Sequence, residues 1–210
     1  MVAFDAAFQS EFARLCRWRR DVRRFSTQPV AQALVDELLE IAHGAPSVGN
    51  SQPWRWLRIE SQDMRAAIQD NFRRANLQAA EIYSGDRAEL YARLKLEGLE
   101  AAPVQFAVFC DRTTEQGLGL GRQSMPETLD YSVVTSITTF WLAARAHGLG
   151  VGWVSIIEAD EIGKLLEAPP AWRLISYLCV GWPLEEHDVP ELEREGWQVR
   201  TALSPKLSER

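Results

Sequence analysis

The sequence predicts an α+β fold in which helices alternate with about four short strands in layers. Three observations predict it. Several segments repeat apolar residues every three or four positions, as amphipathic helices do. Shorter apolar segments are bounded by glycine, proline or polar residues, as strands are. No repeat or linker-like stretch divides the 210 residues. We therefore expect a single domain over residues 1–210.

Helices are expected wherever the apolar spacing is helical. The first covers residues 4–18, where three phenylalanines lie four positions apart. Pro29 is expected to open the second helix and Gly44 to end it. Gly148 is the expected C-terminal cap of a long apolar helix. The remaining helices are expected at residues 63–80, 86–100, 129–147 and 159–166.

Strands are expected at residues 54–59, 104–110, 151–157 and 174–180. The run at 104–110 is almost continuously apolar, which indicates a strand buried on both faces. Residues 111–126 are rich in glycine and lack periodicity, so a loop is expected there. The tail over residues 184–210 is polar and punctuated by proline. We expect it to be extended and to pack on a second subunit.

Composition excludes several classes of function. Hydrophobic residues make up 46% of the chain and charged residues 25%, as in ordinary globular proteins. The net charge of −6 disfavours a nucleic-acid partner. The three cysteines are far apart and the three histidines are isolated, which predicts neither a disulfide framework nor a metal site. Since neither a signal peptide nor a membrane span is recognisable, we expect a cytoplasmic protein that does not bind membranes.

The loop over residues 43–54 is the first candidate binding site. Its prolines and Gly49 disfavour regular structure, and it carries Ser47, Asn50 and Gln52. Amide side chains offer donors and acceptors together, and backbone near glycine is open to a ligand. Such an array suits a flat heterocycle with C=O and N–H edges, such as a flavin. An ordinary polar loop between helix and strand is the alternative.

A second candidate is the cluster of five arginines within residues 17–24. Guanidinium groups bind phosphate oxygens in pairs, so the cluster is a candidate anion clamp. The alternative is a solvated basic end of the first helix, stabilised by the helix dipole. Asp21 lies among these arginines, which predicts a lowered pKa for its carboxyl group. Asp21 is either a structural counter-ion or an acid/base group near a bound ligand.

Two further segments are weaker candidates for a functional site. Residues 148–155 contain three glycines but lack the G-x-G-x-x-G pattern and lead into a strand, which disfavours a Rossmann dinucleotide site. The glycines serve either tight packing or the approach of a ligand. Ser155 has no histidine or aspartate in a recognisable elbow, so a hydrolase nucleophile is not predicted. Residues 121–128 indicate only a loop and a helix start.

Taken together, these motifs resemble the flavin-dependent nitroreductase-like superfamily over roughly residues 10–182. The resemblance depends on three runs in order, namely Arg19-Arg20-Asp21-Val22-Arg23-Arg24-Phe25, Ala45-Pro46-Ser47 with Asn50, Gln52, Pro53 and Trp54, and Gly148-Leu149-Gly150. Within the superfamily, the chain is most similar to the family of 5,6-dimethylbenzimidazole synthases. Asp21 stands where ordinary nitroreductases carry serine, and residues 94–98, 122–128 and 150–155 also resemble the synthases. Gln123-Ser124 departs from the basic residue and threonine expected there.

The resemblance implies a three-layer fold with a mostly antiparallel sheet, and an intertwined homodimer with FMN at the subunit interface. It also implies the oxygen-dependent fragmentation of reduced FMN to 5,6-dimethylbenzimidazole, the lower ligand of vitamin B12, with release of erythrose 4-phosphate. FMN is then a substrate. Asp21 would be the acid/base group, and Ser155 would form a hydrogen bond near the reacting ring atoms. The residues implied in flavin binding are Arg19, Arg20, Asp21, Val22, Arg23, Ser47, Gly49, Asn50, Gln52, Val154, Ser155 and Arg200.

Residues 91–98 would close over this site as a lid and exclude water, which is sensible for reactive oxygen chemistry. A lid leaves little room for a nicotinamide, so a separate flavin reductase is expected to supply reduced FMN. One alternative is an NAD(P)H-dependent nitroreductase or flavin reductase of the same fold. Asp21 argues against this alternative, because ordinary nitroreductases carry serine at this position. Another is a non-catalytic module that stores or senses FMN.

Overall fold

A computed structural model describes residues 3–208 of the chain. Its centre is a four-stranded sheet in the order β1-β2-β4-β3, in which all neighbouring strands are antiparallel. The strands are β1 (Trp54–Arg58), β2 (Val104–Asp111), β3 (Gly150–Val154) and β4 (Trp172–Gly181). The two strands at the edges of the sheet are therefore β1 and β3, which are far apart in sequence.

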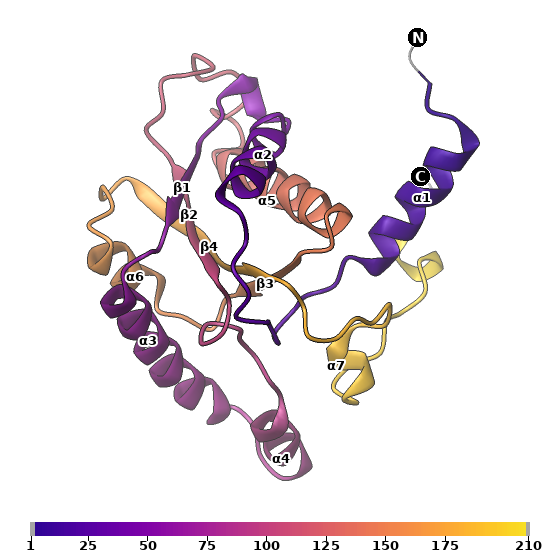
Figure 1. Cartoon of the computed structure of the whole chain (residues 1–210). Helices are drawn as coiled ribbons and strands as arrows, with labels where there is room; N and C mark the ends of the chain where they lie inside the picture. Colours follow the sequence, from indigo (N-terminus) through magenta and orange to yellow (C-terminus); the bar gives the residue numbers. More distant parts are fainter. Residues whose placement is uncertain (1–2, 209–210) are drawn as a thin grey trace.

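Helices cover both faces of the sheet and give the three layers (Figure 1). Every residue of β2 is buried, and its side chains alternate between two hydrophobic clusters. One cluster joins Phe106 and Val108 to α2 (Gln32–His43) and α5 (Thr128–Ala146). The other joins Ala107 and Phe109 to α3 (Gln62–Ala80) and α6 (Ala159–Leu165). Because successive side chains of a strand point to opposite faces, this one apolar strand contributes to both hydrophobic clusters.

The remaining elements lie outside these layers. The first helix, α1 (Ala6–Trp18), has no buried residue and extends away from the sheet (Figure 1). The helix α4 (Asp86–Arg93) packs against α3. The short helix α7 (Glu191–Arg194) and the 3-10 turns η1 (Val48–Asn50) and η2 (Ser204–Lys206) complete the chain.

The α+β class, the antiparallel sheet and the loop over 111–126 are confirmed, while several predicted boundaries are wrong. The second helix begins at Gln32 rather than Pro29. Strand β3 ends at Val154, so Ser155 follows it, and β4 is longer than expected at both ends. The long helix ends as predicted, because Gly148 follows it with a positive φ of 79°.

The predicted helix over 86–100 begins at Asp86 as expected, but its predicted end is wrong, because α4 ends at Arg93. Tertiary contacts fix the following residues in irregular conformations. The carbonyl of Lys95 accepts a hydrogen bond of 2.8 Å from Arg23. A Cβ atom on Gly98 would lie 2.4 Å from the ring of Phe25, so residue 98 must approach this ring closely. The segment is therefore shaped by the arginine-rich stretch rather than by its own helix propensity.

Among residues 3–208, no helix combines the length and the apolar character that crossing a membrane requires.

Candidate functional site

The arginine-rich stretch over residues 17–25, called here the arginine segment, runs from the end of α1 to the free edge of β3. The N–H of Val22 donates to the carbonyl of Val151 at 3.0 Å, and Asp21 pairs with Val151 as in a parallel sheet. A Cβ atom on Gly152 would lie 2.2 Å from the carbonyl oxygen of Val22. Gly152 is therefore needed for close packing of the segment, which is one of the two roles open for the glycines of this run.

The carboxylate of Asp21 has a fixed orientation in this arrangement. Its Oδ1 accepts a hydrogen bond of 2.8 Å from the backbone N–H of Trp153, and its Oδ2 accepts one of 3.0 Å from Nε of Arg23. Burial raises the pKa of Asp21 above its ordinary value, although the Trp153 amide and Arg23 favour the ionised form.

The prediction of a lowered pKa for Asp21 is therefore wrong. Only Arg23 among its neighbours in sequence forms an ion pair with Asp21 within the described residues. The side chain of Arg20 instead donates to the carbonyls of Asp188 and Arg19, and Arg19 lies over the ring of Trp141 at 4.8 Å. Residues that flank a carboxylate in sequence need not face it in space.

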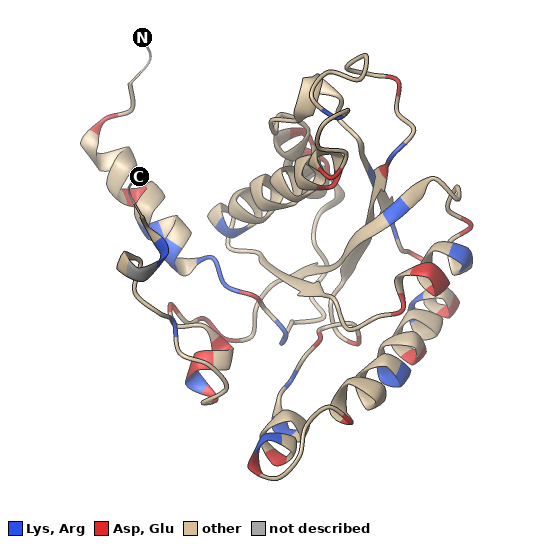
Figure 2. Cartoon of the chain, turned by 180° about the vertical axis from the view of Figure 1, so that it is seen from behind, with Lys and Arg blue, Asp and Glu red and all other residues tan. Residues whose placement is uncertain are grey.

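Four arginines line a recess of about 240 Å³ beside Asp21, called here the arginine recess. They are Arg19, Arg20, Arg23 and Arg200, and the wall is completed by Asp21 and residues 190–192. The structure thus brings Arg200 from the tail to the arginine segment. Figure 2 shows the basic stretch after α1 facing the charged helix α7.

The arginines of the recess differ in their partners. Arg23 is engaged by Asp21 and by the Lys95 carbonyl. Among residues 3–208, Arg19, Arg20 and Arg200 form no ion pair with a carboxylate. Burial, together with the charges of Arg19 and Arg200, lowers the pKa of Arg20. This excess of positive charge is suited to binding an anion, as a clamp would.

Ser155 lies at the end of β3, two residues beyond the amide that binds Asp21. Its side chain is exposed, whereas the preceding Val154 is buried in the second core cluster. Asp21 and Ser155 are thus presented by the same edge of the sheet. Val22 packs against Gly150 beside them.

The amide loop over residues 45–53 is bonded largely to itself and to the loop over 111–126. The hydroxyl of Ser47 accepts from the Gln52 N–H at 3.1 Å, and the Gln52 side chain donates to Oδ1 of Asn50 at 3.2 Å. Gln116 donates to Oε1 of Gln52 at 3.0 Å. A Cβ atom on Gly49 would lie 2.8 Å from the carbonyl oxygen of Leu120.

Two residues of the amide loop have strained backbones. Asn50 and Gln52 have φ angles of 55° and 43°, in the left-handed region that non-glycine residues rarely adopt. Such strain gathers at ligand-binding sites. The strain therefore favours a binding role over an ordinary polar loop.

A single chain does not bring the two halves of the predicted site together. The amide loop leads into Trp54 of β1, which pairs with Cys110. Asp21 lies against Val151 of β3, which pairs with Val180. Cys110 and Val180 lie at opposite ends of the β2–β4 pair, and β1 and β3 are opposite edges. The arginine recess and the amide loop are therefore diagonally opposed across the sheet.

Glu191 is a residue of the site that sequence reasoning missed. Its side chain is only 9% exposed, and it lies between the two consecutive arginines Arg23 and Arg24. A single carboxylate in a polar tail has no periodicity to mark it. The one available signal is the preceding Pro190, which indicates a helix start.

The chain is similar to known proteins over most of its length. The model of the Nitroreductase family matches residues 16–182. A 5,6-dimethylbenzimidazole synthase of Rhodospirillum rubrum is 53% identical over 197 residues, which cover 94% of this chain and 93% of that protein. A protein of the same name from Rhodobacter capsulatus is 45% identical, covering 93% and 94%. A solved structure of iodotyrosine deiodinase bound to FMN and 3-iodo-L-tyrosine is similar with a TM-score of 0.70 at 25% identity, covering 84% and 91%.

The chain therefore belongs to the nitroreductase family. Within that family, the relatives that match nearly its whole length at 53% and 45% identity are 5,6-dimethylbenzimidazole synthases.

Proposed function

We propose that this protein binds reduced FMN and fragments it with O2 to 5,6-dimethylbenzimidazole, with release of erythrose 4-phosphate. The observation that carries the proposal is the placement of Asp21. Its carboxylate is held by Trp153 and Arg23 beside a recess lined by four arginines, three of which have no carboxylate partner among residues 3–208. The high identity to synthases over almost the whole chain supports the same reaction.

The arginine recess fits the phosphate of FMN. Arg19, Arg20 and Arg200 converge on it without carboxylate partners among residues 3–208, so an incoming phosphate would supply the missing counter-ion. Arg23 is already bonded to Asp21 and to Lys95. We therefore assign the phosphate to Arg19, Arg20 and Arg200, and the ribityl or ring edge to Arg23.

The amide loop fits the isoalloxazine ring, because Ser47, Asn50 and Gln52 offer donors and acceptors on a strained backbone next to Gly49. Since this loop and the arginine recess are diagonally opposed in one subunit, a second copy would supply the loop. A homodimer with two such sites follows from twofold symmetry. We include in the proposal that the tail over 184–210 also contacts the partner.

Asp21 and Ser155 would have different roles in the reaction. When bound, reduced FMN supplies the electrons for O2 and the ring from which the benzimidazole is made. Asp21 would hold and move a proton at its carboxylate, and its raised pKa suits a group that is protonated in one step and ionised in the next. The exposed hydroxyl of Ser155 would donate a hydrogen bond near the reacting ring.

Residues 91–98 would exclude water from the site. Their placement supports this, because the Lys95 carbonyl is bonded to Arg23 and Gly98 contacts Phe25. With such a cover, a separate flavin reductase would supply reduced FMN. Three distant cysteines are typical of a reducing compartment, and we place the reaction in the cytoplasm.

A nitroreductase or flavin reductase of the same fold is the second candidate, supported by the family as a whole. The experiment that separates the two is to reduce FMN chemically under anaerobic conditions with the purified protein, admit O2, and analyse the products by chromatography and mass spectrometry. We expect 5,6-dimethylbenzimidazole and loss of FMN. Recovery of intact FMN, together with steady oxidation of NADPH in a parallel sample, would favour the reductase.

A further inference from the structure

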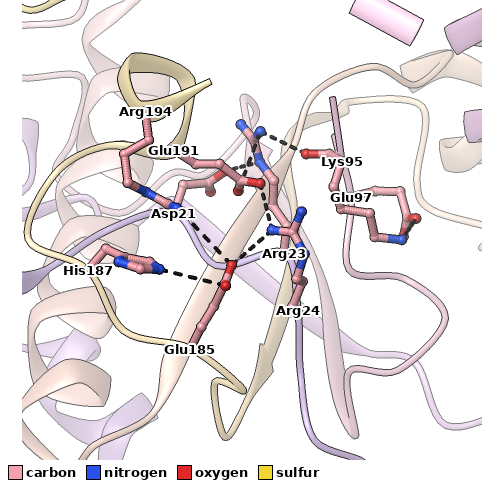
Figure 3. A network of polar contacts seen from close by, with 9 residues as sticks. All are labelled: Asp21, Arg23, Arg24, Lys95, Glu97, Glu185, His187, Glu191 and Arg194. Carbon is pink, nitrogen blue, oxygen red and sulfur yellow. Dashed lines mark hydrogen bonds and ion pairs between the residues drawn. The ribbon is translucent and has the colours of Figure 1, made fainter. Parts of the chain in front are cut away.

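Glu191 bridges the two arginines that follow Asp21. One oxygen, Oε1, accepts a hydrogen bond of 2.6 Å from Arg24, and the other, Oε2, lies 3.8 Å from Nη1 of Arg23. Arg23 in turn donates to Asp21. Figure 3 shows Asp21, Arg23 and Arg24 of the arginine segment meeting Glu191 of α7.

The C-terminal segment that carries Glu191, residues 182–191, follows the arginine segment along its length. The N–H of Leu184 donates to the carbonyl of Arg24 at 3.0 Å, and the N–H of Ser26 donates to that of Trp182 at 2.8 Å. Arg20 donates to the carbonyl of Asp188 at 2.7 Å. These bonds position α7, so the buried carboxylate of Glu191 is fixed in space relative to Asp21.

We propose that Glu191 is a positioning residue, which holds Arg23 and Arg24 and thereby sets the orientation and the charge environment of Asp21. This inference rests on the proposed role of Asp21 as the acid/base group. A carboxylate that is nine-tenths buried needs partners to offset its desolvation. Glu191 has such partners only in the arginine segment, among the described residues.

Glu191 shares Arg23 with Asp21, and its own negative charge raises the pKa of the Asp21 carboxyl group. Removing that charge should therefore favour ionised Asp21 in two ways. The like charge disappears, and Arg23 becomes free to pair with Asp21 alone. The charged groups lining the two recesses beside Asp21 are Arg19, Arg20, Arg23 and Arg24 on its own segment, Arg145 on α5, and Glu185, Glu186, His187, Glu191, Arg194 and Arg200 in the tail. Lys95 and Glu97 after α4 and Cys179 on β4 are the other titratable groups near this segment.

The test is a pH titration of the Asp21 carboxyl carbon by NMR in the full, substrate-free chain. The variants are Glu191→Gln and, as a matched control, Glu185→Gln. Glu185 also binds Arg24, at 2.9 Å, but it is exposed and does not contact Arg23 or Asp21. We expect Glu191→Gln to move the titration midpoint of Asp21 to lower pH and Glu185→Gln to leave it in place.

A second variant should shift the titration midpoint of Asp21 in the opposite direction. Arg24→Gln removes the main partner of Glu191 and leaves its charge near Arg23, so the midpoint of Asp21 should move to higher pH. This variant also serves if Glu191→Gln does not fold, which circular dichroism would reveal. In the loaded enzyme, the acid limb of the pH–rate profile should move in the same direction as the midpoint in each variant.

An unchanged Asp21 midpoint in both Glu191→Gln and Arg24→Gln would overturn the inference. So would equal shifts in Glu191→Gln and Glu185→Gln. The titration needs no FMN, so its outcome is independent of the reaction. If the wild type forms no 5,6-dimethylbenzimidazole but the midpoints move as expected, the proposed function fails and the positioning role stands.

Discussion

The carboxylate of Asp21 accepts a 2.8 Å hydrogen bond from the backbone N–H of Trp153, although the two residues are 132 positions apart. This bond ties the arginine segment to the edge of the sheet that also carries Ser155. Because the second oxygen of Asp21 is bound by Arg23, rotation of the carboxylate is restricted. The acid/base group of the proposed reaction is thus oriented by the scaffold itself.

Asp21→Asn tests the chemical role of this carboxylate. The amide keeps an oxygen for the Trp153 N–H, so the fold and FMN binding should persist. Product formation should fall roughly 100-fold or more, since a positioned acid/base group contributes on that scale. The measurement is 5,6-dimethylbenzimidazole formed per unit time, with FMN binding followed by fluorescence. Equal product from wild type and variant would remove Asp21 from the mechanism.

The raised pKa of Asp21 predicts how the free energy of unfolding depends on pH. Burial is its main cause, so the folded protein holds the proton above the ordinary value of 3.8. As the pH rises above 3.8, the unfolded chain loses this proton first, and the contribution of Asp21 to the free energy of unfolding falls. It levels off above the pKa of the folded state.

Asp21→Asn supplies the reference, because asparagine does not titrate and the other groups are shared. Urea unfolding of both proteins at several pH values should show the wild type losing stability relative to the variant as the pH rises. If the wild type instead gained stability relative to the variant as the pH rises, the pKa of Asp21 in the folded protein would be lowered.

Gly152→Ala tests the packing of the arginine segment on β3. The added Cβ atom would lie 2.2 Å from the Val22 carbonyl oxygen, so the segment must move. We expect a loss of roughly 1–3 kcal/mol in the free energy of unfolding, as in other overpacked sites. Gly163→Ala is the matched control, since nothing lies within 4 Å of its Cβ position in α6.

The control should gain about 0.5–1 kcal/mol, because alanine is the better helix former. Both values come from urea unfolding. Similar stabilities for the two variants would show that the segment does not pack as described.

Arg200→Met tests the arginine recess. Loss of one charge-assisted contact should weaken FMN binding roughly tenfold or more. Riboflavin, which lacks the phosphate, should bind the wild type and the variant alike. Arg73→Met is the control, because Arg73 is exposed on α3 and pairs with Asp70. The measurement is fluorescence titration at fixed ionic strength. An equal loss for FMN and riboflavin would place Arg200 away from the phosphate.

The layers of the fold were predictable because they depend on spacing. The run at 104–110 is apolar throughout, and its burial on both faces follows from that pattern alone. The end of α4 was not predictable, because residues 94–98 contain good helix formers. Their conformation depends on Arg23 and Phe25, which lie about 70 positions earlier. Tertiary contacts thus override the helix propensity of residues 94–98.

The site was predictable only in part, for a related reason. The density of arginines in residues 17–24 and the amides of the loop at 45–53 are visible in the sequence. Which arginine faces Asp21 depends on side-chain direction, and Arg20 turns to Asp188 instead. Glu191 becomes recognisable only when the C-terminal segment is seen beside Arg24.

The most direct test of the central claim is the ratio of 5,6-dimethylbenzimidazole formed to FMN lost when O2 is admitted to the protein with chemically reduced FMN. Wild type and Asp21→Asn are measured side by side by chromatography and mass spectrometry. We predict about one benzimidazole for each FMN consumed by the wild type, and little loss of FMN with the variant. Complete recovery of FMN from the wild type, with hydrogen peroxide as the only product, would contradict the account.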